Sequence, residues 1–131
     1  MSNNNARIMI VDDMVTMRKL IINICGEIGY TDIIEAGDGT QAWDLIQNSS
    51  PSVSLVISDL TMQKGSGIDL IKRIRSDSRF QSLPFLIMIT EGEKDQLGLA
   101  VKSGVDHYIT KPFTAPVLKA KLQEIYEKRG G

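Results

Sequence analysis

Ile8-Met9-Ile10-Val11-Asp12-Asp13 is the stretch of the sequence that decides the fold. Four apolar residues in a row predict a strand buried on both faces, as in a parallel sheet covered by helices. The two aspartates end this strand and place two carboxylates at its carboxyl end. From Met14 to Ile28, apolar residues recur every three or four positions, which predicts a helix that ends at Gly29. The chain therefore begins with one strand–helix unit.

The same alternation of a short apolar run and a longer helical pattern continues along the chain. The other expected strands are Ile33–Ile34, Val53–Ile57, Phe85–Ile89 and Val105–Ile109, and the other expected helices are Ala42–Ile46, Ile68–Ile74, Lys94–Ser103 and a last helix capped by Thr114 with Pro116 in its first turn. Five alternating units predict an α/β fold, a doubly wound five-stranded parallel sheet with helices on both faces. We expect a single domain over residues 1–131, with its core at about residues 6–128 and a short polar N-terminal tail.

The composition narrows the class of protein. Fifteen basic and sixteen acidic residues give a net charge of −1, without the basic excess that is typical of nucleic-acid surfaces. One cysteine excludes a disulfide framework and a cysteine-based metal cluster, and it favours a reducing compartment. The polar start lacks the pattern of a signal peptide, and no apolar run approaches the ~20 residues of a membrane helix. We therefore expect a cytoplasmic monomer that binds neither nucleic acid nor membrane.

Polar residues follow four of the expected strands. They are Asp12 and Asp13, then Asp59, Thr90 and Lys111. Because the carboxyl ends of parallel strands share one edge, where open sheets bind ligands, these side chains should lie together. Two carboxylates at ~4 Å repel each other by about 4 kcal/mol, so one lysine cannot compensate all three. Mg²⁺ prefers carboxylate oxygens and bridges to phosphate, so the residues predict a magnesium site with a hydroxyl and an ammonium left to hold an anion.

A carboxylate in such a site can also act as a nucleophile toward phosphorus. Phosphoryl transfer depends mainly on positioning and on neutralising charge, which a metal, a lysine and a hydroxyl donor supply. Asp59 lies centrally if its strand is interior, with the Asp12-Asp13 pair beside it. Asp59 is therefore the expected phosphoryl acceptor, and the pair is expected to hold the metal.

These motifs resemble the receiver domain of bacterial response regulators, and the length most resembles the single-domain CheY-type members of chemotaxis. The matching pieces are Val11-Asp12-Asp13, Ser58-Asp59 with Met62 and Gly67 behind it, Ile89-Thr90, and Tyr108-Ile109-Thr110-Lys111-Pro112-Phe113. The resemblance covers about residues 6–128. It implies a flavodoxin-like sheet with the strand order 2-1-3-4-5.

The resemblance also implies a role for each matching residue. The expected metal ligands are Asp12, Asp13, Asp59 and the backbone carbonyl of Thr61. The expected catalytic residues are the phosphoacceptor Asp59 and two phosphate contacts, Thr90 and Lys111. The expected switch residues are Thr90 and Tyr108. The Lys111–Pro112 peptide is expected to be cis. Two residues depart from the usual pattern, because Gln63 replaces a proline and Glu91 replaces a small residue.

The implied function is that of a phosphorylation-activated switch in a two-component system. Asp59 would take a phosphoryl group from a histidine kinase, and the face of the fourth helix, fifth strand and fifth helix would contact a downstream protein, most simply in chemotaxis. Such a domain is not a metabolic enzyme, but it catalyses its own Mg²⁺-dependent phosphorylation and dephosphorylation. The alternative within this class is a phosphorelay intermediate that passes phosphate to a histidine phosphotransfer protein.

Other classes fit the residues less well. A flavodoxin-like FMN protein needs hydroxyls and amides after the first strand, where the carboxylates of Asp12 and Asp13 would repel a phosphate. A phosphatase with an aspartyl nucleophile usually has a second aspartate two residues later, but Thr61 occupies that position. An inactive receiver relative is disfavoured by the intact set of strand-end residues.

Overall fold

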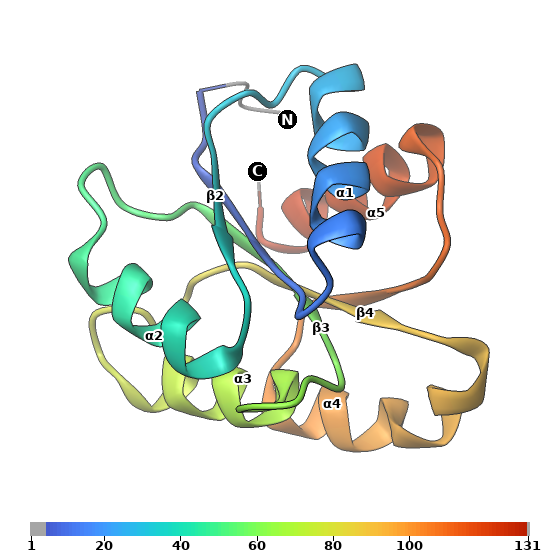
Figure 1. The fold of residues 1–131 in the computed structure, drawn as a ribbon. Helices are drawn as coiled ribbons and strands as arrows, with labels where there is room; N and C mark the ends of the chain where they lie inside the picture. Colours follow the sequence, from blue (N-terminus) through green and yellow to red (C-terminus); the bar gives the residue numbers. More distant parts are fainter. Residues whose placement is uncertain (1–4, 131) are drawn as a thin grey trace.

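A five-stranded parallel sheet forms the centre of the molecule (Figure 1). The structure, a computed structural model, describes residues 5–130, so the polar start at residues 1–4 lies outside the described part. The strands are β1 (Ile8–Val11), β2 (Ile33–Ala36), β3 (Leu55–Asp59), β4 (Phe85–Ile89) and β5 (His107–Thr110). Their order is β2-β1-β3-β4-β5, which confirms the predicted fold.

Helices cover both faces of this sheet. They are α1 (Val15–Glu27), α2 (Gly39–Asn48), α3 (Gly67–Ser76), α4 (Leu97–Ser103), preceded by the 3-10 helix η1 (Glu91–Gln96), and α5 (Ala115–Lys128). Helices α1 and α5 lie on one face, and α2, α3 and α4 lie on the other (Figure 1). None of the helices within residues 5–130 is long and apolar enough to cross a membrane.

The alternation of side chains along each strand divides the apolar core into two layers. In β1, Met9 and Val11 pack toward α2, α3 and α4, whereas Ile8 and Ile10 pack toward α1 and α5. All four residues are fully buried. A strand buried on both faces explains why the sequence shows a continuous apolar run there and no alternation with polar residues.

Most element boundaries agree with the sequence within two or three residues. The prediction of one helix over Lys94–Ser103 was wrong in its first three residues, because these belong to the 3-10 helix η1 and the α-helix begins at Leu97. Asp38 caps α2 by accepting a hydrogen bond from the Gln41 backbone, so α2 begins before the expected Ala42. Local capping contacts, which strand and helix periodicity do not report, set these starts.

The turn after β3 depends on a glycine. A side chain at Gly67 would overlap the backbone carbonyl oxygen of Asp59, and the Gly67 N–H donates to the carbonyl of Leu60 at 3.0 Å. Ser66 caps α3 by accepting from the Asp69 backbone N–H at 3.1 Å. The start of α3 is thus held against the carboxyl end of β3, where Asp59 lies.

Candidate functional site

Three carboxylates meet at the carboxyl edge of the sheet. Asp12 and Asp13 follow β1, and Asp59 ends the neighbouring strand β3. One carboxylate oxygen from each of the three lies within 4.8 Å of those of the other two. Asp12 is fully buried and Asp59 is 6% exposed, whereas Asp13 is open to solvent. Two buried carboxylates beside an exposed one form an oxygen-rich site that a hard divalent cation fits.

Lys111 supplies the positive charge of this site. Its ammonium nitrogen lies 2.7 Å from Oδ1 of Asp59 and 3.4 Å from Oδ2 of Asp12. Lys111 follows β5, and the backbone N–H of Lys111 donates to the carbonyl of Ile89 at the end of β4. The Lys111–Pro112 peptide is cis, as expected. The structure therefore brings together the four charged residues that the strand ends predicted.

Burial and charge shift the protonation of two of these groups. Burial raises the pKa of the Asp59 carboxyl to about 6, because loss of solvent outweighs the hydrogen bond from Lys111, and the charge of Asp12 acts in the same direction as burial. Burial lowers the pKa of Lys111, but the hydrogen bond to Asp59 and the negative charges of Asp59 and Asp12 outweigh it and hold the pKa above its usual value. One ammonium thus compensates only part of the negative charge.

Backbone and side-chain donors hold the β1 aspartates in place. The backbone N–H of Met14 donates to Oδ1 of Asp12 at 2.9 Å, and the backbone N–H of Gln63 donates to Oδ2 of Asp13 at 3.2 Å. Arg18 donates to the backbone carbonyl of Asp12 at 2.7 Å. The loops after β1 and β3 are therefore tied together beside the carboxylates.

Thr90 lies at the rim of the site. It follows β4, is exposed, and precedes η1. Thr90 and Glu93 form a capping box, in which the side chain of each residue bonds the backbone N–H of the other, and the bond from the Thr90 N–H to Oε1 of Glu93 is 2.9 Å long. The Thr90 hydroxyl is thus directed to η1 in this structure and not to Lys111.

Thr61 joins the same arrangement from the loop after β3. Its hydroxyl donates to Oε2 of Glu93 at 2.6 Å. Partial burial raises the pKa of Glu93, but the hydrogen bonds from Thr61 and Thr90 outweigh burial and hold the pKa below its usual value. Glu93 therefore remains a carboxylate beside Asp59, and its charge contributes to the raised pKa of Asp59.

Tyr108, the other expected switch residue, lies in β5, where it pairs with Ile87 of β4. The side chain is half-buried and packs against the apolar layer that includes Ile89 and Leu97. The ammonium of Lys121 in α5 lies 4.3 Å from the centre of the Tyr108 ring. The ring therefore contacts both the apolar layer at the end of β4 and a side chain of α5.

Two residues of this site were missed by the sequence analysis. Glu93 has a recognisable signal, because a threonine followed three residues later by a glutamate is typical of a capping box. Arg18, which also donates from Nε to Oε1 of Glu35 at 2.9 Å, has no such signal. Its contact with Asp12 depends on how the β1 loop folds over the start of α1.

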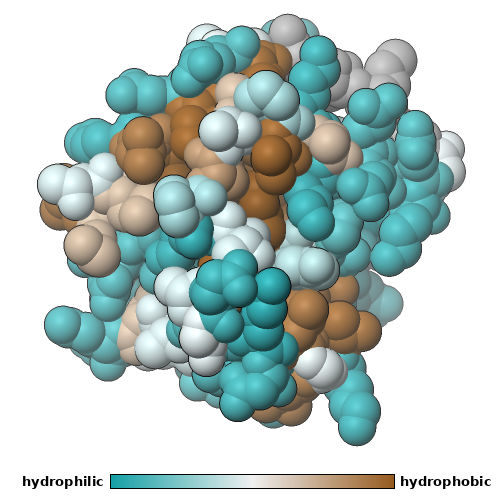
Figure 2. Space-filling view, turned by 90° about the vertical axis from the view of Figure 1, so that its right-hand side faces the viewer, coloured by the Kyte–Doolittle hydropathy of each residue, from teal (hydrophilic) through white to brown (hydrophobic). Residues whose placement is uncertain are grey.

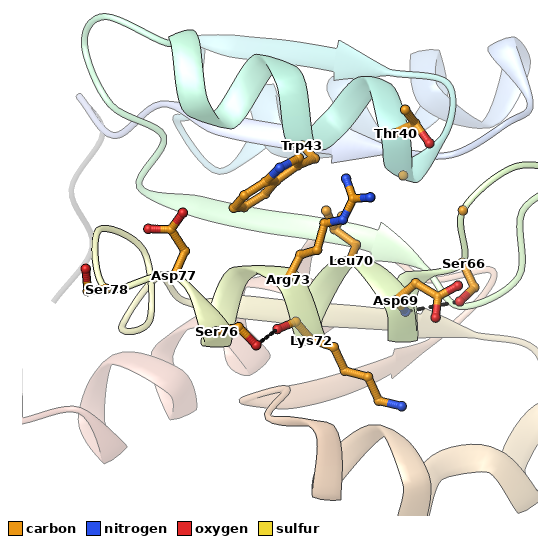
Figure 3. Close-up of a pocket in the computed structure, with 12 residues that line it drawn as sticks. Thr40, Trp43, Ser66, Asp69, Leu70, Lys72, Arg73, Ser76, Asp77 and Ser78 are labelled. Carbon is orange, nitrogen blue, oxygen red and sulfur yellow. Dashed lines mark hydrogen bonds between the residues drawn. The ribbon is translucent and has the colours of Figure 1, made fainter.

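An open recess lies elsewhere, between α2 and α3 (Figure 3). Its volume is about 940 Å³, and Trp43 and Leu70 supply apolar lining while Arg73 and Asp69 supply charge. The Arg73 guanidinium lies 6.0 Å from the centre of the Trp43 ring. None of the site residues predicted from the sequence lines this recess. This recess is therefore separate from the strand-end residues of the acidic site.

Comparison with known proteins gives a consistent result. The family model described as "Response regulator receiver domain" matches residues 8–123. The chemotaxis protein CheY1 of Helicobacter pylori is 41% identical over 119 residues, which are 91% of this chain and 95% of the relative. The chemotaxis protein CheY of Pseudomonas aeruginosa is 40% identical over 125 residues, 95% of this chain and 99% of the relative.

The solved structures agree with this assignment. The chemotaxis response regulator CheY4 of Vibrio cholerae superposes with a TM-score of 0.81 at 26% identity, covering 92% of this chain and 98% of that chain. A response regulator receiver domain protein from Clostridium thermocellum superposes with a TM-score of 0.84 at 26% identity, covering 95% and 96%. Because the family model spans most of the chain and the relatives match it nearly end to end, this chain belongs to the response regulator receiver domain family.

Proposed function

We propose that this chain is a phosphorylation-activated switch of a two-component system. Asp59 accepts a phosphoryl group from a histidine kinase, and the domain then signals by contact with another protein, in chemotaxis. The observation that carries the proposal is the contact of 2.7 Å between the Lys111 ammonium and Oδ1 of Asp59, beside the carboxylates of Asp12 and Asp13. The chemotaxis names of the relatives support the setting. Cytoplasmic location, the monomeric state and one domain over residues 1–131 are part of the proposal.

The reaction follows from the positions of these side chains. A carboxylate oxygen of Asp59 attacks the phosphorus, the P–N bond to the donor histidine breaks, and its electron pair stays on the imidazole. Lys111 donates to an oxygen of the transferred group and balances its charge. Water later attacks the phosphorus, the acyl phosphate P–O bond breaks, and Asp59 returns to a carboxylate with release of inorganic phosphate.

Asp12, Asp13, Asp59 and the backbone carbonyl of Thr61 are the residues that we expect to hold Mg²⁺. The grouped hard oxygen donors, incompletely balanced by Lys111, fit such an ion. When bound, Mg²⁺ supplies positive charge to the oxygens of the phosphoryl group. The bond from the Gln63 N–H keeps Asp13 directed toward the other two carboxylates.

Thr90 and Tyr108 are the proposed switch residues. The Thr90 side chain is engaged in the capping box with Glu93, so a turn of this side chain toward a phosphoryl oxygen would change the box. Tyr108 packs with the apolar residues at the end of β4, so a movement of the β4–η1 loop changes the packing of its ring. A local change at Asp59 thereby reaches the surface of β5.

The proposed output surface is formed by α4, β5 and α5. Leu99 and Val101 of α4 are 51% and 60% exposed, and Val117 of α5 is 43% exposed. Figure 2 shows hydrophobic residues exposed in separate areas among hydrophilic ones on one side of the molecule. Exposed apolar side chains on the helices that precede and follow β5 are suited to binding a partner protein.

Phosphorylation by a small donor tests the proposal. The protein is mixed with acetyl phosphate and Mg²⁺, and its intact mass is measured. We expect the mass of one phosphoryl group to be added to the natural protein and none to Asp59→Asn, whereas Asp44→Asn, which changes an exposed acid of α2, should be modified normally. A natural protein that stays unmodified contradicts the proposal.

A second experiment separates chemotaxis from a phosphorelay. The protein is loaded with beryllofluoride, a phosphoryl mimic, and is mixed with either a flagellar motor switch protein or a histidine phosphotransfer domain. Binding of the loaded form to the motor protein supports the chemotaxis role. Transfer of labelled phosphate from Asp59 to the phosphotransfer domain, without motor binding, supports the phosphorelay role.

A further inference from the structure

Glu93 connects the two loops that flank the acidic site. One carboxylate oxygen, Oε2, accepts from the Thr61 hydroxyl at 2.6 Å, and the other, Oε1, accepts from the Thr90 backbone N–H at 2.9 Å. Thr61 lies two residues after Asp59, and Thr90 follows β4, the strand next to β3. A single side chain thus joins the β3–α3 loop to the β4–η1 loop.

The contact with Thr61 goes beyond ordinary helix capping. A capping box requires of the glutamate side chain only that it accept a hydrogen bond from the N-cap backbone N–H, and Oε1 does so here. The bond from Thr61 to Oε2 spans 32 residues of sequence and contributes nothing to the start of η1. Glu93 is half-buried although five other residues of η1 are exposed. The side chain is therefore held between the two loops.

Glu93 also brings a fourth negative charge to the site. Its carboxylate bonds the hydroxyl of Thr61, which lies two residues after Asp59, so its charge is held at the loop that leaves the acceptor. A phosphoryl group on Asp59 adds a charge of about −1.5 to −2 in the same region. Like charges repel, so a Glu93 carboxylate held in this position opposes the phosphorylated state.

We propose that Glu93 is a positioning residue that holds the resting state, acting as a latch through Thr61 and Thr90. This inference rests on the proposed function of Asp59. With the latch closed, the Thr90 side chain is engaged in the capping box and the β3–α3 loop is fixed. Phosphorylation has to open both bonds, so the latch sets how readily Asp59 takes and keeps the phosphoryl group.

Three variants separate the latch from a general effect of charge. Glu93→Ala removes both bonds and the charge, and Glu93→Gln removes the charge but keeps one acceptor oxygen. Thr61→Val removes only the bond between the loops and leaves the charge of Glu93 in place. Asp95→Asn is the matched control, because Asp95 is an exposed acid on the same short helix.

The first measurement is the affinity for beryllofluoride at saturating Mg²⁺, by calorimetric titration of each full chain. We expect Glu93→Ala to bind about tenfold more tightly than the natural protein, since both a like charge and two bonds are lost. Glu93→Gln and Thr61→Val should each bind more tightly by a smaller factor. Asp95→Asn should match the natural protein.

The second measurement is hydrogen exchange at the Thr90 backbone N–H without mimic. The exchange rate should rise in Glu93→Ala. It should also rise in Thr61→Val if the latch holds the two loops together, whereas a purely electrostatic role of Glu93 would leave the rate in Thr61→Val unchanged. The latch is wrong if both Glu93 variants bind the mimic more tightly while Thr61→Val keeps the mimic affinity and the Thr90 exchange rate of the natural protein. Equal binding by the natural protein and all Glu93 variants overturns it as well, and so does a matching gain in Asp95→Asn.

The proposed function can fail separately from the latch. If the natural protein and Asp59→Asn bind the mimic equally or not at all, the acceptor role of Asp59 is wrong and the latch falls with it. If the natural protein binds the mimic, Asp59→Asn does not, and the Glu93 variants match the natural protein, only the latch is wrong.

Discussion

The ammonium of Lys111 lies 2.7 Å from Oδ1 of Asp59, although β5 and β3 are separated in the sheet by β4. The lysine side chain therefore reaches across the end of β4 to the acceptor carboxylate. Both side chains are largely buried, with 11% and 9% of their surface exposed. Because the ammonium also contacts Oδ2 of Asp12 at 3.4 Å, its loss would leave two buried carboxylates without a counter-charge, whereas the ammonium itself keeps Asp12 when Asp59 is neutralised.

Replacing Lys111 by methionine should destabilise the metal-free protein. At pH 8, above the raised pKa of Asp59, that carboxyl is charged, and the loss of the ammonium leaves it uncompensated, so we expect a loss of about 2 to 4 kcal/mol in the free energy of unfolding. Urea unfolding measures this loss. At pH 5 the loss should be smaller, because Asp59, with a pKa raised to about 6, is then mostly protonated. Lys119→Met, at an exposed position of α5, is the control, and an equal loss in both variants contradicts the prediction.

Replacing Asp59 by asparagine should stabilise the metal-free protein in a pH-dependent way. The folded state raises the pKa of Asp59 from 3.8 to about 6, so it binds the proton more tightly than the unfolded state does. The stability of the natural protein therefore falls as the pH rises between these values. The advantage of Asp59→Asn should grow from pH 4 to pH 7 and reach about 3 kcal/mol, since one pKa unit corresponds to about 1.4 kcal/mol. Unfolding curves across this range that keep a constant difference would falsify the raised pKa.

Mg²⁺ should raise the melting temperature of the natural protein. An ion that binds only the folded state stabilises it by mass action, by about 2.7 kcal/mol at a hundredfold excess over the dissociation constant. The gain should be reduced in Asp13→Asn, which removes the exposed carboxylate of the group, and retained in Asp44→Asn. Differential scanning calorimetry with and without Mg²⁺ measures both. A metal-dependent shift of equal size in Asp13→Asn argues against Asp13 as a ligand.

The strand ends of this fold could be predicted because apolar runs and their polar stops are local in sequence. Asp12, Asp59 and Lys111 were found this way, since parallel strands bring their carboxyl ends to one edge. The strand order came from the resemblance and not from the apolar pattern. Both faces of each inner strand are buried by helices, so these strands appear in the sequence as continuous runs of Ile, Val and Met that could be recognised.

The details of the loops could not be predicted in the same way. The helix expected from Lys94 begins as the 3-10 helix η1, because the capping box of Thr90 and Glu93 sets its start at Glu91. The bond between Glu93 and Thr61 joins residues that no short motif relates. Such contacts depend on the path of two loops after each leaves the sheet, and periodicity carries no information about that path.

Gly67, at the start of α3, should not tolerate a side chain, whereas Gly98 of α4 should tolerate one. A Cβ at Gly67 would overlap the carbonyl oxygen of Asp59, which is backbone and cannot move aside without shifting the end of β3. We expect Gly67→Ala to lower the free energy of unfolding by about 1 to 3 kcal/mol, as overpacking does. Because the shift displaces Asp59 from Lys111, the variant should also take up the phosphoryl group more slowly from acetyl phosphate.

Gly98→Ala is the matched control for this prediction. Gly98 lies within α4, and a Cβ there has nothing within 4 Å, so alanine adds helix propensity without a clash. We expect a gain of about 0.5 to 1 kcal/mol and a normal rate of phosphorylation. Urea unfolding and the rate of mass increase are measured on both variants. If Gly67→Ala matched Gly98→Ala in both readouts, the close approach of the α3 start to Asp59 would have no role in holding the acceptor in place.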